Sequence, residues 1–133
     1  MEIASLKWFT VTCSAATLDA ALKVAVITPL ERTETYMIRD IRLIGGGTNF
    51  GAGGDRLLDL TDGTTVWTQI ANADLETAPT ATLTWGNAKV PFLTGKNNTV
   101  SVAGQKIYFA YSGGASDHTT GSIVFHVLLE RLT

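Results

Sequence analysis

The hydrophobic positions in two segments of the chain follow the period of a β-strand, in which every second residue faces the same side. In residues 6–13, phenylalanine, valine and cysteine occupy one parity, and Trp8 stands among threonines in the other. Successive side chains of a strand point to opposite faces, so this pattern predicts a half-buried strand. In residues 122–132 both parities carry hydrophobic residues. The pattern there predicts a last strand that is partly buried on both faces.

The longest predicted strand, residues 36–44, changes the parity of its hydrophobic positions at Arg39 and Asp40. Such a change has two explanations. Either the strand buries different faces at its two ends, or it contains a β-bulge, in which an extra residue reverses the direction of the side chains that follow. The sequence leaves both explanations open. A glycine-rich excursion follows at residues 45–54.

Two hairpins are predicted from turn residues that separate hydrophobic runs. The first covers residues 56–70 and folds over Asp62-Gly63, a pair typical of tight primed turns, which need positive φ at both central residues. The second joins residues 98–103 to residues 106–111 across Gly104-Gln105.

The other predicted elements are strands at 22–28, 80–85 and 90–93 and single helical turns within 14–21 and 71–79. In total we expect about eight to ten short strands, at the spacing of an antiparallel sandwich or barrel. The predicted fold class is therefore all-β, an antiparallel β-sandwich with little helix. A jelly roll is favoured because two packed four-stranded sheets use this number of strands. An immunoglobulin-like sandwich is the alternative, although its Cys, Trp, Cys pattern is missing.

The composition predicts one domain whose surface is partly covered by other chains. The 133 residues fit a single β-sandwich domain, 1–133, with a short N-terminal arm, 1–5. Charged residues make up 17% of the chain, below the typical figure of about 25%, and the mean hydropathy is +0.18. A small domain with so little charge is expected to bury apolar surface against another subunit. A surface coated with threonine and glycine is the alternative.

Charge and cysteine usage exclude several classes of partner. The net charge is −2, the isoelectric point is near 5.6 and the basic residues are scattered, so direct nucleic-acid binding is not expected. No apolar stretch approaches the ~20 residues of a membrane helix, and the N-terminus lacks a signal-peptide pattern. Cys13 has no second cysteine to pair with, which fits folding in a reducing cytoplasm.

The glycine-rich segment and the acidic residues after it invite two ligand hypotheses that the sequence does not favour. A phosphate-binding loop ends in Gly-Lys-Ser/Thr before a helix, whereas this segment ends in Gly-Gly-Asp-Arg before a strand. Its glycines are expected to permit positive φ in a long loop. Asp55, Asp59 and Asp62 lack the spacing of a calcium loop, so a solvated acidic face is the favoured interpretation. No cofactor or metal is predicted.

No arrangement of residues in the sequence predicts catalysis. His118, His126, Ser112, Ser116 and Cys13 are possible catalytic groups, but no known motif connects them. We therefore predict that the chain is not an enzyme.

The aromatic residues allow a binding function instead. They are Trp8, Trp67, Trp85, Tyr108 and Tyr111. Together they could form a sugar-stacking platform, although packing in the core or in an interface explains them with fewer assumptions.

Aromatic residues and arginines are the best candidates for contacts with other chains, because both are enriched in interfaces. Trp8 stands on the threonine-bearing face of the first strand, and Phe50 is expected to be an exposed aromatic in the glycine-rich segment. An ion network around the parity change could serve a subunit contact, with ordinary surface pairing as the alternative. The candidate interface residues are Trp8, Phe50, Trp67, Arg39, Arg42 and Arg56.

Three stretches carry a resemblance to a protein family. They are YMIRDIRLIGGGTNF at 36–50, GGDRLLDLTDGTTVW at 53–67, and the Tyr-Ser-Gly-Gly and Leu-Leu-Glu-Arg elements within 111–131. Together they resemble small virion proteins of tailed bacteriophages, of the capsid decoration or auxiliary type with jelly-roll folds. The resemblance covers most of the chain and rests on general texture, so no functional residue is carried over from it.

The resemblance implies a non-enzymatic decoration or cement protein that caps the capsid lattice as a symmetric homo-oligomer, with a trimer expected. Its partners would be copies of itself and the major capsid protein or other virion proteins. It would be assembled in the host cytoplasm and reside in the virion. The alternatives are a carbohydrate-binding or lectin-like module, and a subunit of the phage tail or of a receptor-binding fibre.

Overall fold

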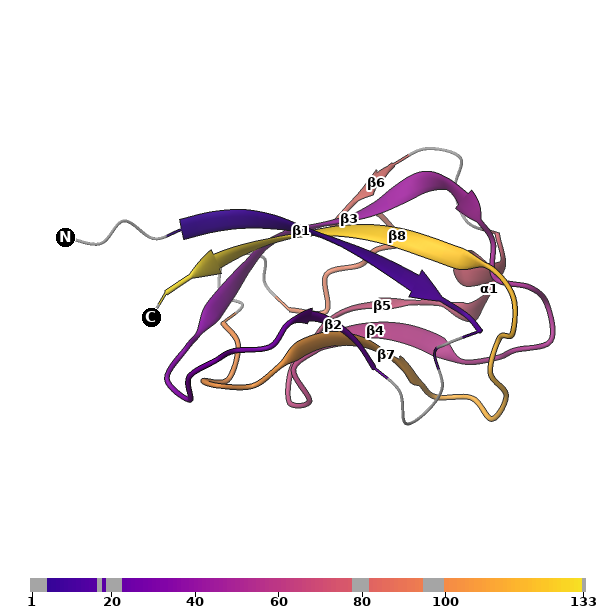
Figure 1. Cartoon of the computed structure of the whole chain (residues 1–133). Coiled ribbons are helices and arrows are strands. Elements are labelled where there is room, and N and C mark those ends of the chain that lie inside the picture. The colour runs from indigo at the N-terminus through magenta and orange to yellow at the C-terminus, as the bar shows by residue number, and fades with distance from the viewer. Residues whose placement is uncertain (1–4, 17, 19–22, 78–81, 95–99, 133) are drawn as a thin grey trace.

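Two four-stranded antiparallel sheets make up most of the computed structural model, which describes residues 5–16, 18, 23–77, 82–94 and 100–132 (Figure 1). The strands are β1 (Ser5–Ser14), β2 (Lys23–Ile27), β3 (Tyr36–Thr48), β4 (Leu57–Thr61), β5 (Val66–Ile70), β6 (Leu83–Thr84), β7 (Ile107–Ser112) and β8 (Ser122–Arg131). One short helix, α1 (Asn72–Glu76), completes the described elements. The predicted all-β sandwich with little helix is confirmed. Most of the predicted N-terminal arm lies outside the described residues, and β1 begins at Ser5.

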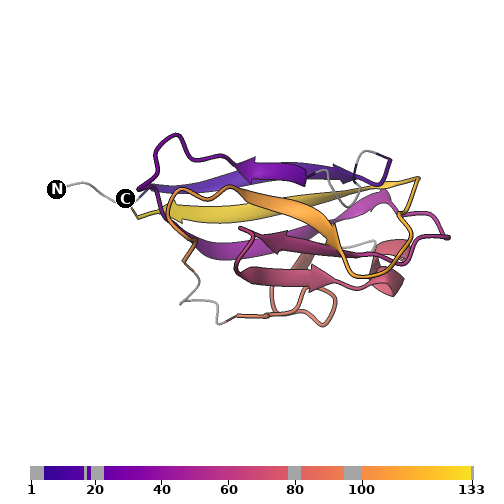
Figure 2. The ribbon, with the colours of Figure 1, turned by 90° about the horizontal axis from the view of Figure 1, so that it is seen from below.

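The strand order is that of a jelly roll. One sheet has the order β1-β8-β3-β6 and the other β2-β7-β4-β5 (Figures 1 and 2). The first strand pairs with the last, the second with the seventh, the third with the sixth and the fourth with the fifth. Rolling one long antiparallel hairpin into two sheets produces these pairs, and this is how a jelly roll is built. Distant segments such as β1 and β8 therefore become neighbours.

A β-bulge explains the parity change in β3. Ile38 lies opposite Leu129 of β8, whereas Asp40 lies opposite Leu128, so Arg39 is the extra residue. An extra residue reverses the facing of everything after it. As a result Ile38 and Ile41, three positions apart, both have no exposed surface. The bulge turns both halves of the strand toward the same core.

The core lies between the two sheets. Its centre contains the stacked rings of Phe109 in β7 and Phe125 in β8, whose centroids are 4.3 Å apart. Both rings are fully buried and are surrounded by aliphatic side chains from β3, β4 and β8. Each sheet contributes every second residue to this layer, as expected for a sandwich.

The first predicted hairpin is confirmed as β4 and β5, but its turn is not a two-residue primed turn. Thr61 pairs with Val66, so four residues form the loop. Gly63 has φ of 95°, and no non-glycine residue in the described chain has positive φ. Instead, Oδ1 of Asp62 accepts hydrogen bonds from the backbone N–H groups of Thr64 and Thr65. The aspartate side chain thus builds the turn that a second positive φ was expected to provide.

The second predicted hairpin is wrong. β7 pairs with β2 and β4, not with the chain before it. Residues 98 and 99 lie outside the described part, and the following residues run beside the start of β3, where Ser101 N–H donates to the carbonyl of Tyr36. Long-range partners in the roll override the local turn signal at Gly104-Gln105.

The smaller predictions have mixed outcomes. β2 and α1 confirm the strand at 22–28 and the helical turn at 71–79. β6 is shorter than the predicted strand at 80–85, of which 80 and 81 lie outside the described residues. The strand at 90–93 is wrong, because Val90 closes a turn by accepting a hydrogen bond from Gly86. Most of the helical turn at 14–21 lies outside the described residues.

Candidate functional site

The outward-facing side of the β1-β8-β3-β6 sheet carries hydrophobic residues where a solvated sheet would carry polar ones. The side chains on this outer face are Leu6, Trp8, Thr10 and Thr12 of β1, Val124, His126, Leu128 and Glu130 of β8, Met37, Asp40, Arg42 and Ile44 of β3, and Thr84 of β6. Leu6 is 60% exposed and Trp8 40%. The outer face is therefore the main candidate for an interaction surface.

Strand register places Trp8, His126 and Arg42 together near the middle of the outer face. Trp8 lies opposite Leu128, and His126 lies between Thr10 and Arg42 in the next row. The guanidinium of Arg42 is 4.6 Å from the centroid of the Trp8 ring, and the Trp8 and His126 rings are 6.2 Å apart. A cation over an indole ring is attracted by the ring's negative face. The contact fixes both side chains in position.

The charges on the outer face are arranged so that the cations are more exposed than the anions. Arg39, the bulge residue, donates two hydrogen bonds to Glu130, at 2.7 and 2.8 Å. Arg42 pairs with Asp40 at 3.3 Å. The arginine side chains are 35% and 44% exposed, whereas those of Glu130 and Asp40 are 11% and 15% exposed. A partner would meet hydrophobic side chains and guanidinium groups on this face. The face therefore suits a partner whose own surface is apolar and carries acidic groups.

The other sheet presents a polar outer side. The side-chain amide of Gln69 in β5 donates to Asp59 of β4 at 2.8 Å and to Ser112 of β7 at 3.2 Å. Lys23 lies 4.4 Å from the centroid of the Tyr108 ring. These polar groups already satisfy one another within one sheet. The two sides of the sandwich thus differ in chemistry, and the outer face of the β1-β8-β3-β6 sheet is the side suited to docking.

The structure brings together half of the predicted interface residues. Trp8 and Arg42 lie on the outer face, and Arg39 lies beside it at the bulge. Arg56 is elsewhere, in the loop before β4, where it pairs with Asp117 and donates to the carbonyl of Gly113.

The prediction that Phe50 is exposed is wrong. Phe50 is 1% exposed, because its N–H donates to the carbonyl of Leu75 in α1 and its ring packs against His118 at 5.4 Å. Trp67 is also buried, with no exposed surface. The glycine-rich segment folds back onto the molecule. At Gly54 an added Cβ would lie 2.5 Å from the backbone nitrogen of His118, so glycine permits this close approach.

The three aspartates near β4 do not form a solvated acidic face. Asp59 and Asp62 are 7% and 2% exposed, which contradicts the favoured interpretation. Asp55 is exposed, and its Oδ1 accepts hydrogen bonds from the backbone of Ser116 and Ala115, which hold the pKa of its carboxyl below the usual value. Asp55 and Asp62 each organise a loop, whereas Asp59 lies within β4 and accepts a hydrogen bond from Gln69 of β5. No group of three or more potential metal ligands occurs in the described residues.

The possible catalytic groups are placed in structural roles. His118 is 1% exposed, and its Nε2 lies 2.7 Å from Oδ1 of Asn72 in α1. Cys13 is fully buried, and burial raises the pKa of its thiol, which disfavours a reactive thiolate. His126 lies on the outer face in β8, whereas His118 lies in the loop between β7 and β8.

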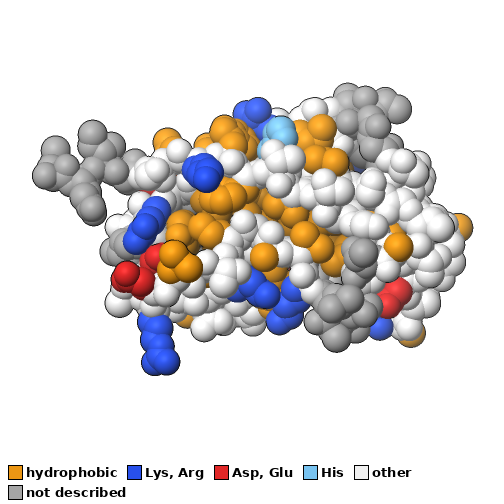
Figure 3. All heavy atoms as spheres, viewed as in Figure 1, with side chains coloured by type: hydrophobic (Ala, Val, Ile, Leu, Met, Phe, Trp, Pro, Cys, Tyr) orange, Lys and Arg blue, Asp and Glu red, His pale blue; other side chains and the backbone are white. Residues whose placement is uncertain are grey.

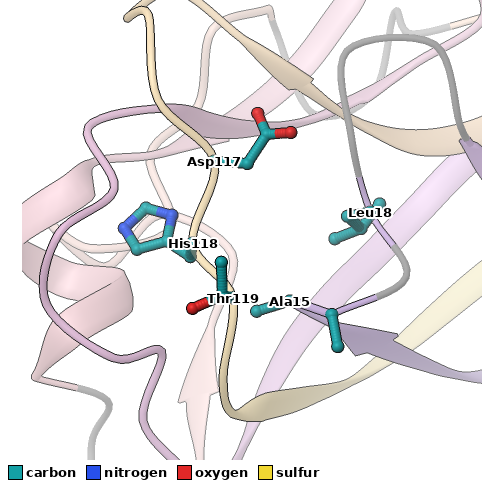
Figure 4. Close-up of a pocket in the computed structure, with 6 residues that line it drawn as sticks. Ala15, Leu18, Asp117, His118 and Thr119 are labelled. Carbon is teal, nitrogen blue, oxygen red and sulfur yellow. The ribbon is translucent and has the colours of Figure 1, made fainter.

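A shallow pocket of about 300 Å³ lies beside His118, lined by Ala15, Ala16, Leu18, Asp117, His118 and Thr119. Figure 4 shows the His118 imidazole turned away from Ala15 and Leu18, toward α1. The ring therefore serves the packing of the loop rather than the pocket.

The possible sugar-stacking platform does not form, and the favoured explanation by packing holds for four of its five residues. Trp67 and Trp85 are 0% and 4% exposed, and Tyr108 and Tyr111 are 9% and 6% exposed. Their rings are used for packing, and burial raises the pKa of Tyr111 to about 12. Trp8 alone among the predicted platform residues presents a large part of its ring to solvent.

The sequence analysis missed Met37 and Leu128 as members of the outer face. The signal for Leu128 was present, because Val124 and Leu128 share the parity of His126 in the last strand. Met37 could not be assigned in this way, because the bulge after it made the facing of β3 ambiguous.

Comparisons with known proteins define the fold of the chain but not its family. No family model matches the chain, and no curated protein matches it. Among solved structures, a chain of the cyanophage Pam1 capsid asymmetric unit has a similar fold, with a TM-score of 0.58 and 15% sequence identity. The match covers 96% of this chain and 85% of that chain, so the two are of similar length. The shared class is an all-β sandwich. No helix in the described residues is long and apolar enough to cross a membrane.

Proposed function

We propose that this chain is a non-enzymatic structural protein of a bacteriophage virion, a decoration or cement protein that binds the capsid lattice as a symmetric homo-oligomer. The observation that carries the proposal is the likeness of almost the whole chain to a chain of a cyanophage capsid. The chain would act in the virion after assembly in the host cytoplasm, and a trimer is the expected form. One fold can host many functions, so the function also depends on the chemistry of the surface.

The outer face supplies the docking chemistry that this function needs. It offers Trp8 as an aromatic anchor, with Leu6, Met37 and Leu128 around it. Arg42 is held over the Trp8 ring, so little side-chain entropy is lost when a partner binds. We propose that the outer face contacts the major capsid protein or another virion protein. Many identical contacts on a lattice add through avidity, so each contact can be modest.

The test is a capsid-binding assay with capsids that lack this protein. The purified chain is added to such capsids, and the bound fraction is measured by co-sedimentation. We expect saturable binding by the natural chain and a loss of about tenfold or more in affinity for Trp8→Ala, since buried aromatic anchors dominate interfaces. Arg42→Glu should weaken binding as well, by reversing the charge that faces the partner.

Arg32→Glu is the matched control, because Arg32 is exposed in the loop before β3, away from the outer face. It should bind as the natural chain does. If the natural chain does not bind capsids at all, the proposed function is wrong. If Arg32→Glu and Arg42→Glu weaken binding equally, the assignment of the outer face is wrong.

A further inference from the structure

We propose that copies of this chain associate head to tail through the two lateral edges of the sandwich, an inference that rests on the proposed function as a homo-oligomer. The front edge is formed by β1 and β2, which end the two sheets on one side. The back edge is formed by β6 and β5, which end the two sheets on the opposite side. It includes the segment after β6, residues 86–93, which reaches β5 where the Leu93 N–H donates to the carbonyl of Trp67. The front edge of one copy would contact the back edge of the next.

The front edge has the features of a strand edge that recruits another chain. β1 pairs with β8 over ten residues with no shift in register, and no described strand pairs with its other side. Lys7 is its one charged residue, and it contains neither proline nor glycine. Protected edge strands usually carry charges, proline or bulges that prevent such pairing. The outer edge of β1 is therefore open.

Hydrophobic side chains emerge between the two strands of the front edge. Phe9 of β1 and Val24 and Ile27 of β2 pack against the core but remain partly exposed. Figure 3 views the molecule from this side and shows a band of hydrophobic side chains along β1 and toward β2, with lysines and arginines around it. Such a band, rimmed by charge, is typical of an interface.

The back edge presents two exposed hydrophobic side chains. Phe92 and Leu93 are 47% and 50% exposed. The Phe92 ring packs against Trp85 with centroids 5.0 Å apart, and Leu93 N–H donates to the carbonyl of Trp67 in β5. The turn after Trp85 is closed by a hydrogen bond from Gly86 to Val90. Aromatic side chains that are already ordered lose little entropy on binding.

The positions of the two edges favour a head-to-tail contact over a two-fold contact. Figure 2 shows the turn after β6 on the side opposite β2. A two-fold contact joins a surface to itself, so it would bury one hydrophobic edge and leave the other in water. A head-to-tail contact buries both edges at once. Such contacts close into rings when the rotation between copies permits, and a trimer is one such ring.

The test uses two variants that each disable one edge with exposed substitutions. The front-edge variant is Lys7→Glu with Ala25→Glu, and the back-edge variant is Phe92→Glu with Leu93→Glu. The molar mass of each is measured by sedimentation across a range of concentrations. Each variant alone should associate only at a protein concentration about tenfold or more above that at which the natural chain associates. The control, Ala52→Glu with Ala73→Glu, adds two negative charges, as the back-edge variant does, at exposed positions outside both edges and should associate normally.

Mixing the two variants separates the possible modes of association. In a head-to-tail contact, the intact back edge of one variant meets the intact front edge of the other, so an equimolar mixture should form a heterodimer. If one variant alone associates as the natural chain does, a two-fold contact through the edge that it leaves intact explains the association, and the proposal is overturned. A mixture that stays monomeric at concentrations where the natural chain associates would also overturn it. A natural chain that is monomeric at every concentration would also overturn it. Capsid binding by the natural chain is measured separately, so failure of the proposed function is seen independently of these outcomes.

Discussion

At the scale of single residues, the buried carboxylate of Asp62 holds two distant segments of the chain in place. Asp62 is 2% exposed, and its two oxygens accept hydrogen bonds from three backbone N–H groups. Oδ1 serves Thr64 and Thr65 of its own turn, and Oδ2 serves Val102, 40 residues away, at 2.8 Å. A carboxylate that accepts several N–H bonds orders the backbone around it. One side chain therefore joins the β4–β5 turn to the chain before β7.

Replacement of Asp62 by alanine should destabilise the protein by about 2 to 4 kcal/mol, because buried N–H groups lose a charged acceptor. Urea unfolding followed by circular dichroism measures the change. Glu31→Ala, at an exposed loop position, is the control and should have little effect. Equal stability of Asp62→Ala and the natural chain would show that the Asp62 hydrogen bonds contribute nothing net.

Asp55 predicts a dependence of stability on pH. The ordinary pKa of an aspartate carboxyl is about 3.8, and in the folded state the N–H groups of Ser116 and Ala115 hold the pKa of Asp55 below this value. A lowered folded pKa contributes stability above the unfolded value, and this contribution is lost as the pH falls below about 3.8 toward the folded pKa. Unfolding measured between pH 5 and pH 2 should therefore show a steeper loss of stability for the natural chain than for Asp55→Asn. Parallel curves would contradict the role of Asp55.

At the scale of elements, the bulge in β3 makes the long strand serve one core along its whole length. Without the extra Arg39, residues after it would face solvent, since a shift of one residue exchanges the faces of a strand. With it, Ile38 and Ile41 both point inward, and Arg39 reaches Glu130 of β8. The bulge thus places an ion pair beside the outer face while preserving the core.

The bulge predicts that Ile38→Ala and Ile41→Ala are about equally destabilising, each by about 2 to 5 kcal/mol, because both leave a cavity in the core. Ile44→Ala, on the partly exposed outer face, should cost less. Chemical denaturation of the three variants measures the difference. A small effect at Ile41 together with a large effect at Ile44 would mean that simple alternation continues through the strand and that the bulge is absent.

At the scale of the whole molecule, the roll separates the hydrophobic outer face of one sheet from the polar outer side of the other. Trp67 and Trp85 are enclosed, and Trp8 is left on the outer face with 40% of its surface exposed. The tryptophans therefore report on different parts of the protein. Only an event on the outer face should change the environment of Trp8 while the fold stays intact.

Quenching of tryptophan fluorescence by acrylamide should thus detect one accessible component in the free protein. Binding to capsids should protect this component, because docking removes Trp8 from solvent. Trp8→Phe is the matched control and should lack the accessible component in the free state. If quenching is unchanged by saturating capsids, the outer face is not the docking surface.

The sequence predicted the parts of this protein that depend on neighbouring residues. The spacing of hydrophobic residues predicted β1 and β8, and the Asp-Gly pair predicted the β4–β5 hairpin. The parity change marked the position in β3 where the structure has a bulge, but it did not distinguish a bulge from a change of buried face. The prediction of the second hairpin was wrong because the partners of β7 lie far away in the sequence. The prediction that Phe50 is exposed was wrong for the same reason, since α1 and the loop that contains His118 cover it.

The sequence alone determined that the chain is an all-β sandwich, because the period of its hydrophobic residues is a local property that each strand must satisfy. Tertiary structure alone decided which hydrophobic and aromatic side chains remain at the surface. Trp8 and Trp67 are the same residue type in similar strands, yet one is exposed and the other is enclosed. The difference arises because burial depends on what packs against a strand, and the roll sets those neighbours through pairings between distant segments.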